Sequence, residues 1–108
     1  KTQISEAALV KEQVRNRMDG VFADGGFVCL PTAVGPAPLR GLPASAKKDI
    51  QGRLSHLTCI GGTTGRPQLS LPLGELNGLP VGISLMGDHG SDEELIGFAQ
   101  KVETALAN

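Results

Sequence analysis

Two short segments of this 108-residue chain carry residue types that could do chemistry. In the first, His56 and Cys59 lie three positions apart, so in a helix they would share one face and could form a thiol–imidazole pair. Such a pair would supply the nucleophile and general base of a small cysteine-dependent enzyme. Cysteine is also among the residue types most often buried in protein cores. A core cysteine beside a surface histidine is therefore the favoured interpretation.

The second segment, residues 61–65, reads Gly-Gly-Thr-Thr-Gly. As a phosphate-binding loop it lacks the Lys-Ser/Thr ending that contacts phosphate and magnesium. As a nucleophile loop it offers two hydroxyls, but neither Thr63 nor Thr64 has an evident general base, which a hydroxyl nucleophile needs at neutral pH. A helix that stops at the glycines and leads into a strand explains the same residues without chemistry. We therefore predict a structural role for this segment.

The remaining polar candidates are isolated. The two histidines, His56 and His89, belong to no converging set of His, Cys or carboxylate ligands, so we predict neither a metal site nor a cofactor. His56 is expected on a helix surface and His89 in a turn. Arg40 and Arg66 stand beside prolines, and either could orient an anionic substrate. An exposed loop arginine is the commoner situation and is expected for both.

The composition is that of an ordinary globular chain. With 10 basic and 11 acidic residues, it shows no electrostatic footprint for nucleic acid or anionic lipid. No apolar run approaches the roughly 20 residues of a membrane-spanning helix. Cys29 and Cys59 are too few for a disulfide scaffold, so we expect both to be reduced and the protein to be cytoplasmic. The absence of Trp and Tyr and the presence of 15 glycines predict a marginally stable fold.

The elements that would position these residues follow from periodicity. An amphipathic helix is predicted over residues 5–18, and the continuous apolar run 27–30 is typical of a strand covered on both faces. Residues 32–45 are rich in proline and glycine and are predicted to form an extended loop. A second helix is expected over residues 45–60, ended by Gly61 and Gly62.

The C-terminal third predicts a β-hairpin and a last helix. Residues 68–71 and 81–85 alternate and are separated by Asn77-Gly78, so we predict a β-hairpin with an apolar face and a face of small polar residues. Ser91 and Glu94 have the spacing of a capping box that begins a last helix. Its apolar face is expected to contain four residues: Leu95, Ala99, Val102 and Leu106. The predicted order is thus helix, strand, helix, β-hairpin, helix.

Three stretches together resemble the amidase-signature hydrolases. Residues 30–38, Leu-Pro-Thr-Ala-Val-Gly-Pro-Ala-Pro, are similar to a strand and loop found late in that family. Residues 57–72 resemble its helix-to-strand passage, from Leu-Thr-Cys-Ile-Gly-Gly to Gly-Arg-Pro-Gln-Leu-Ser-Leu-Pro. Residues 78–93, which begin Gly-Leu-Pro-Val-Gly, are similar to the family's ending. The order and spacing agree across nearly the whole chain.

The resemblance implies an α/β fold, the C-terminal part of an α/β/α architecture around a mixed sheet. It also implies hydrolysis of a carboxylic amide by a Ser–cis-Ser–Lys triad. Those residues belong to an N-terminal and central signature that nothing here matches, so no catalytic residue can be carried over. We therefore expect residues 1–108 to be a C-terminal segment that is inactive by itself, with the N-terminal and central catalytic region absent.

The same resemblance suggests residues that line the acyl side of the substrate pocket. The matching positions are Pro31, Thr32, Thr58, Cys59 and Ile60, for which simple packing is an equally weighted alternative. Residues 54–57, Leu-Ser-His-Leu, lack the Asp typical of the glutamine-dependent tRNA amidotransferase branch, which argues against that branch. The apolar Cys59–Ile60 pair favours a less polar amide substrate.

Two classes of function follow from these observations. In the first, the chain completes the sheet and part of the pocket of an amidase, so its partners are the remainder of that chain and a small-molecule amide. In the second, it is a non-catalytic binding or structural module that docks a partner on the small-residue face of the hairpin. Neither class involves nucleic acid or a membrane. In the first class, apolar surface meant for missing elements would promote self-association of the isolated chain.

Overall fold

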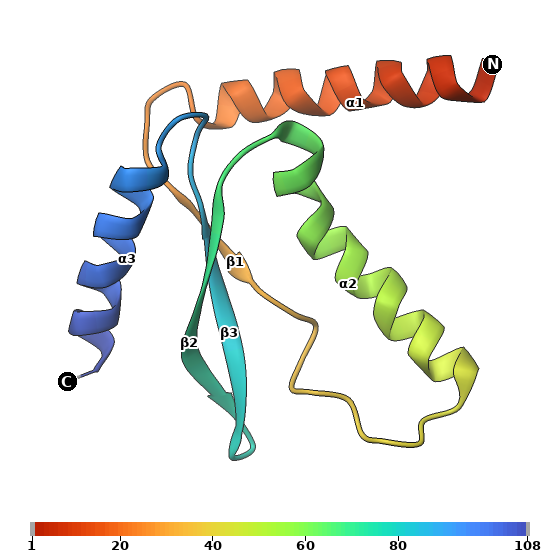
Figure 1. Ribbon diagram of the computed structural model, residues 1–108, viewed down its shortest axis with the longest axis vertical. Coiled ribbons are helices and arrows are strands. Elements are labelled where there is room, and N and C mark those ends of the chain that lie inside the picture. The colour runs from red at the N-terminus through yellow and green to blue at the C-terminus, as the bar shows by residue number, and fades with distance from the viewer. Residues whose placement is uncertain (1, 108) are drawn as a thin grey trace.

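The computed structural model describes residues 2–107 and confirms the predicted order of elements (Figure 1). The elements are α1 (Thr2–Val21), β1 (Val28–Pro31), α2 (Ala44–Thr64), β2 (Gln68–Leu76), β3 (Leu79–Met86) and α3 (Asp92–Leu106). The three strands form one sheet in the order β1-β3-β2, and both strand pairs are antiparallel. The fold is a mixed α/β arrangement, and it is flat, with extents of 47 × 41 × 16 Å.

The predicted hairpin is present and closes at the predicted turn. Asn77 and Gly78 both have positive φ, 53° and 80°, as a type I′ turn requires, and Leu76 pairs with Leu79 across it. The register of β2 shifts between Leu71 and Gly74. Glycine is needed at the shift because a Cβ on Gly74 would lie 2.5 Å from Val81 Cγ2. The hairpin is therefore specified by local sequence at both its turn and its irregularity.

Among residues 2–107, no strand pairs with the outer edge of β1. The backbone N–H of Thr32 donates to Gly82 O at 3.1 Å, which fixes the phase of the β1–β3 ladder. Because bonded and non-bonded pairs alternate in an antiparallel ladder, Cys29 and Pro31 direct their backbone polar groups to the free edge. Pro31, which has no N–H, thus costs the sheet no hydrogen bond. Cys29 and Pro31 are exposed, so the residues described here do not cover both faces of this strand.

The core lies between the hairpin and α3. It consists of Leu71, Leu85, Leu95 and Ala99, with Phe27, Leu69, Leu73 and Val102 packed around it. Phe27 also stacks on Phe98 of α3, with ring centroids 4.7 Å apart. The predicted apolar face of α3 is confirmed for its first three members, whereas Leu106 is 61% exposed. This buried cluster is therefore small and depends on one helix.

The predicted capping box does not form. The Ser91 hydroxyl donates to Asp88 O at 2.7 Å instead of bonding to the first turn of α3, and no side-chain cap is present. Ser91 has φ −94° and ψ 20°, which is not the extended backbone of an N-cap residue, so its hydroxyl faces the preceding turn. Three acidic residues in the first turn still favour this helix end electrostatically.

Both N-terminal helices are longer than predicted. The expected end of α2 at Gly61 and Gly62 is wrong, because the helix continues to Thr64 and ends at Gly65, whose φ is 68° and whose N–H donates to Gly61 O. Gly61 serves a different purpose: a Cβ there would lie 2.8 Å from Gln68 Oε1. Glycine is helix-terminating only where the backbone takes the left-handed conformation, which sequence pattern does not reveal.

Helix α1 projects from the body of the molecule and buries none of its side chains (Figure 1). Of the apolar residues that recur at helical spacing along it, Val14 and Met18 are half-buried, while Val10 remains 56% exposed and Ala7 is exposed. Its N-terminal half therefore offers apolar surface to solvent. No helix in residues 2–107 is both long enough and apolar enough to span a membrane.

Candidate functional site

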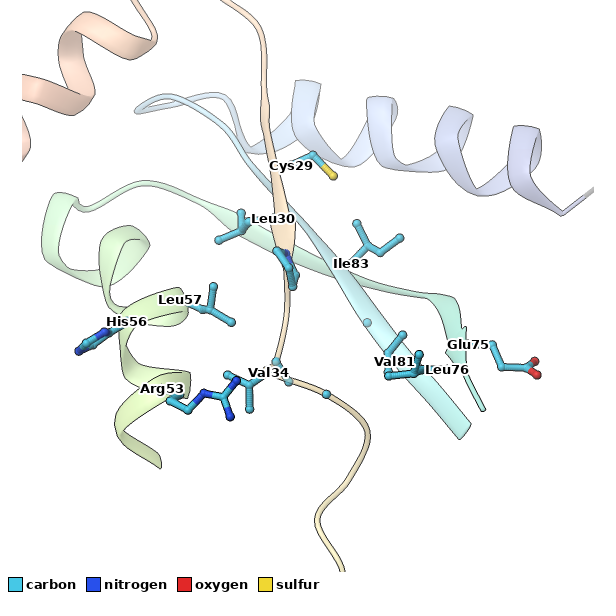
Figure 2. Close-up of a pocket in the computed structure, with 14 residues that line it drawn as sticks. Cys29, Leu30, Val34, Arg53, His56, Leu57, Glu75, Leu76, Val81 and Ile83 are labelled. Carbon is cyan, nitrogen blue, oxygen red and sulfur yellow. The ribbon is translucent and has the colours of Figure 1, made fainter. Parts of the chain in front are cut away.

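A groove of about 730 Å³ opens between β1, the loop after it, α2 and the tip of the hairpin (Figure 2). Leu30 of β1 and Leu57 of α2 project into the space between these elements, and Arg53 extends toward Val34 of the loop. The remaining lining residues are Cys29, Pro31, Ala33, Gly35, His56, Glu75, Leu76, Val81, Gly82 and Ile83. Most of these are apolar, with charge confined to Arg53 on one side and Glu75 on the other. The groove therefore suits a ligand with an apolar body.

The structure places the five predicted pocket residues in different surroundings. Pro31 lines the groove, and Thr32 follows it directly at the end of β1. Thr58 and Cys59 are exposed on α2, Ile60 is half-buried there, and none of these three lines the groove. The Thr58 hydroxyl donates to Leu54 O at 3.1 Å, within its own helix. The pocket roles of Thr32, Thr58, Cys59 and Ile60 stay predictions.

Thr32 joins all three strands through a cluster of hydroxyls. Its Oγ1 lies 2.8 Å from Ser84 Oγ on β3 and 2.9 Å from Ser70 Oγ on β2. Gly82 makes this possible, because a Cβ there would lie 2.9 Å from Thr32 Oγ1 and 3.0 Å from Ser70 Oγ. The small-residue face predicted as a docking surface is thus occupied, at this point, by Thr32. Ser84 is only 2% exposed, so Thr32 satisfies a buried polar group.

We expect a Thr32→Val variant to lose about 1–3 kcal/mol of unfolding free energy, because it leaves the buried Ser84 hydroxyl without this hydrogen-bond partner while keeping the side-chain shape. A Thr32→Ser variant keeps the hydroxyl and should lose no more than about 1 kcal/mol for the missing methyl group. Urea denaturation of the two variants beside the unaltered chain measures the difference. A larger loss in Thr32→Ser than in Thr32→Val would mean that packing of the methyl group, and not the hydroxyl, is what Thr32 contributes.

The side chains considered for chemistry from the sequence lie as follows. His56 and Cys59 are both exposed, and no hydrogen bond joins them among residues 2–107. The expectation that Cys59 is a core residue is wrong for this structure, because Cys59 is exposed, as is Cys29. Thr64 is fully buried, and its hydroxyl donates to Ile60 O at 2.7 Å. His89 lies in the turn before α3, as predicted, with Nδ1 3.2 Å from Gly65 O.

Arg66 is the residue that sequence reasoning misjudged most. It was expected to be exposed, but its side chain is completely buried. Its Nη2 bonds to Asp19 Oδ1 at 2.5 Å, its Nε lies 3.3 Å from Asp88 Oδ1, and its Cζ lies 5.1 Å from the centre of the Phe22 ring. The contact with Asp88 is an ion pair by distance but lacks hydrogen-bond geometry, and neither Nε nor Nη1 has a hydrogen-bond acceptor in the described part of the chain.

Comparison with known proteins gives a consistent result. The family model described as Amidase matches residues 1–96. "Amidase 1" of Oryza sativa subsp. japonica is 32% identical over 97 residues, covering 90% of this chain and 22% of the relative. "Translocon at the outer membrane of chloroplasts 64" of Pisum sativum is 29% identical over 104 residues, covering 96% of this chain and 18% of the relative.

A solved structure agrees with the sequence relatives. A bacterial aryl acylamidase of the amidase-signature enzymes matches the fold with a TM-score of 0.64 and 26% identity, over 88% of this chain and 21% of that one. This chain thus spans about a fifth of the length of the relatives it matches. The family match over residues 1–96, the relatives and the shared fold identify the chain as a member of the Amidase family, within the amidase-signature enzymes.

Proposed function

We propose that this chain is the C-terminal segment of an amide hydrolase and that its groove forms one wall of the acyl side of the substrate site. The observation that carries the proposal is an apolar groove built on the loop after β1, in a chain whose residues 1–96 match the Amidase family. The substrate class is a carboxylic amide with an apolar acyl group, since the lining side chains are mostly apolar. Hydrolysis belongs to a Ser–cis-Ser–Lys triad outside these residues.

The remainder of the amidase chain is the proposed partner. The free edge of β1 supports this, because an unpaired strand edge is a template for a further strand. The exposed apolar residues of α1 and of the loop before α2, among them Ile4, Val10 and Leu39, are surface that such a partner would cover. Without that partner, self-association through the same surface is the expected alternative. The two free cysteines support a cytoplasmic location.

The test compares the purified 108-residue chain with a longer polypeptide in which these residues follow an amidase-signature region. We expect the chain alone to leave a simple aryl amide intact and the longer polypeptide to hydrolyse it. In the longer polypeptide, Leu57→Asp should raise KM several-fold by placing a charge on the groove wall. Ile96→Asp is the matched control, because Ile96 is 52% exposed on α3, away from the groove, and should leave KM unchanged.

Two results would contradict the proposal. Turnover by the 108-residue chain, freed of contaminating enzyme, would show that it contains an activated nucleophile. An unchanged KM in the Leu57→Asp polypeptide would show that substrate does not contact this groove. The first result would contradict the proposed location of the catalytic groups outside this chain. The second would contradict the proposed role of the groove.

A second candidate function is a non-catalytic binding module derived from amidases. The relative in Pisum sativum favours it, because that protein is named as a translocon component and still matches 96% of this chain. In such a module, the groove would bind a partner. A longer polypeptide that contains these residues would then not hydrolyse amides. The assay described above separates the two candidates, since hydrolysis by the longer polypeptide excludes the module.

A further inference from the structure

The helix that forms one wall of the groove is held mainly at its C-terminal end. There α2 packs against α1, and Arg15 Nε donates to Thr63 O at 3.3 Å. Figure 1 shows α2 running away from the sheet, whereas α3 lies beside the hairpin and packs against both of its strands. A helix of this length spans about 30 Å, so a rotation of about 10° at one end moves the other by about 5 Å. The width of the groove therefore depends on the attachment of that one end.

Arg66 lies at the centre of this attachment. Its backbone N–H donates to Gly61 O at 3.0 Å, which ties it to the last turn of α2. Its guanidinium contacts Asp19 and Phe22 at the end of α1, and Asp88 in the turn between β3 and α3. One buried side chain thus connects α1, the end of α2 and the turn before α3. These three segments are far apart in sequence.

A guanidinium suits this task because it is planar and presents its donors in fixed directions. It can face two carboxylates and lie over an aromatic ring at once, which a lysine ammonium cannot do. The two carboxylate side chains are 59% and 47% exposed while the guanidinium is fully buried. Because water competes for both carboxylates, the cluster contributes more to the relative orientation of the connected segments than to the free energy of unfolding.

We infer that Arg66 is a positioning residue that fixes the angle of α2 and thereby the width of the groove. Any effect of the groove width on which substrates fit rests on the proposed function. The geometric role of Arg66 does not. Besides the Arg15–Thr63 hydrogen bond, two other features could hold the same corner, and together they define the competing explanation. These are the hydrogen bond from Gly87 N to Pro67 O, 3.0 Å long, and the close packing of Gly61 on Gln68.

The inference can be tested by measuring the distance across the groove with two spin labels. One label is attached to the native Cys29 on β1 and the other to a cysteine replacing Lys48 near the start of α2, with Cys59→Ser to leave no third thiol. Cys29 and Lys48 are exposed. Double electron–electron resonance in this background should give one narrow distribution of distances. Arg66→Met should widen that distribution by about 5 Å, the displacement expected from a rotation of α2 of about 10°.

Three further variants make the result specific. Arg66→Lys retains a positive charge without the planar fork and should give an intermediate width. Asp88→Asn removes one charged partner and should widen the distribution less than Arg66→Met. Arg17→Met replaces an exposed arginine of α1 that takes part in none of these contacts, and it should leave the distribution narrow.

An unchanged narrow distribution in an Arg66→Met variant that melts cooperatively would overturn the inference. It would mean that contacts other than those of Arg66, among them those of Pro67, Gly87 and Gly61, hold α2 in place. If Arg66→Met loses its helical circular dichroism, Asp88→Asn decides: a wider distribution supports the inference and an unchanged one overturns it. All distances are measured without substrate. Evidence that the groove has no role in amide hydrolysis would therefore not affect this result. The proposed function and the positioning role of Arg66 can be contradicted independently.

Discussion

A Leu95→Ala variant is expected to lose about 3 kcal/mol of unfolding free energy, within the range measured for leucine truncations in protein cores. Leu95 is 3% exposed and belongs to a buried cluster with Leu71, Leu85 and Ala99. The cluster is so small that neighbouring side chains cannot easily close the cavity without leaving the hairpin. For a chain of this size, that loss corresponds to a fall in Tm of more than about 10 °C. Thermal unfolding followed by circular dichroism measures it.

The adjacent residue provides the control for this prediction. Ile96 is 52% exposed on the same helix, so Ile96→Ala removes more side chain from water than from the core. It should change the free energy of unfolding by no more than about 0.5 kcal/mol. If both variants lowered stability equally, Ile96 would be packed as closely as Leu95, and the buried face of α3 would differ from the one described here, because alanine raises the helix propensity at both positions. If neither did, the hairpin and α3 would not form the core of the folded chain.

The hairpin and α3 could be predicted because their signals are local. Asn77-Gly78 selects a turn with two positive φ angles, and the alternation on either side of it assigns one face of the strands to the core. The spacing of Leu95, Ala99 and Val102 assigns the buried face of α3 in the same way. In each case the pattern that predicts the element involves residues close together in sequence. The motif resemblance worked for a similar reason, since it depends on the order of short stretches.

The ends of elements were predicted less well, because they depend on backbone angles that residue type only partly restricts. Gly61 and Gly65 are both glycines after an apolar helical pattern, yet only Gly65 takes the left-handed conformation that ends α2. Ser91 and Glu94 have the spacing of a capping box, but the backbone of Ser91 turns its hydroxyl toward Asp88. Sequence identified the right neighbourhoods and assigned the wrong residue or bond.

The candidate site depended on contacts that no local pattern contains. The groove brings β1 and the loop after it beside α2 and the hairpin tip, and of the five predicted pocket residues Pro31 alone lines it. Arg66 was judged an exposed loop residue because its two carboxylate partners lie 47 and 22 positions away, near Phe22 and His89. A buried arginine has no sequence signature of its own. Only the fold shows which charges meet it.

For the charge cluster around Arg66, we expect an order of stability among variants that the contact distances alone would not suggest. Arg66→Met should change the free energy of unfolding by no more than about 1 kcal/mol, because a methionine can pack on Phe22 and the two half-exposed carboxylates return to water. The double variant Asp19→Asn, Asp88→Asn should lose about 3 kcal/mol, since it leaves a buried guanidinium without a counter-charge. Each asparagine keeps one of the two acceptor oxygens, so the loss reports mainly the removed charge.

Urea denaturation of the two proteins decides this ordering, and the triple variant provides the control. Adding Arg66→Met to the double variant removes the uncompensated charge, so it should recover most of the lost stability although it deletes one more native side chain. Recovery of this kind is expected only where desolvation of the guanidinium dominates the cost. If the triple variant were less stable than the double variant, Arg66 would contribute mainly through packing on Phe22, and the buried charge would be the smaller effect.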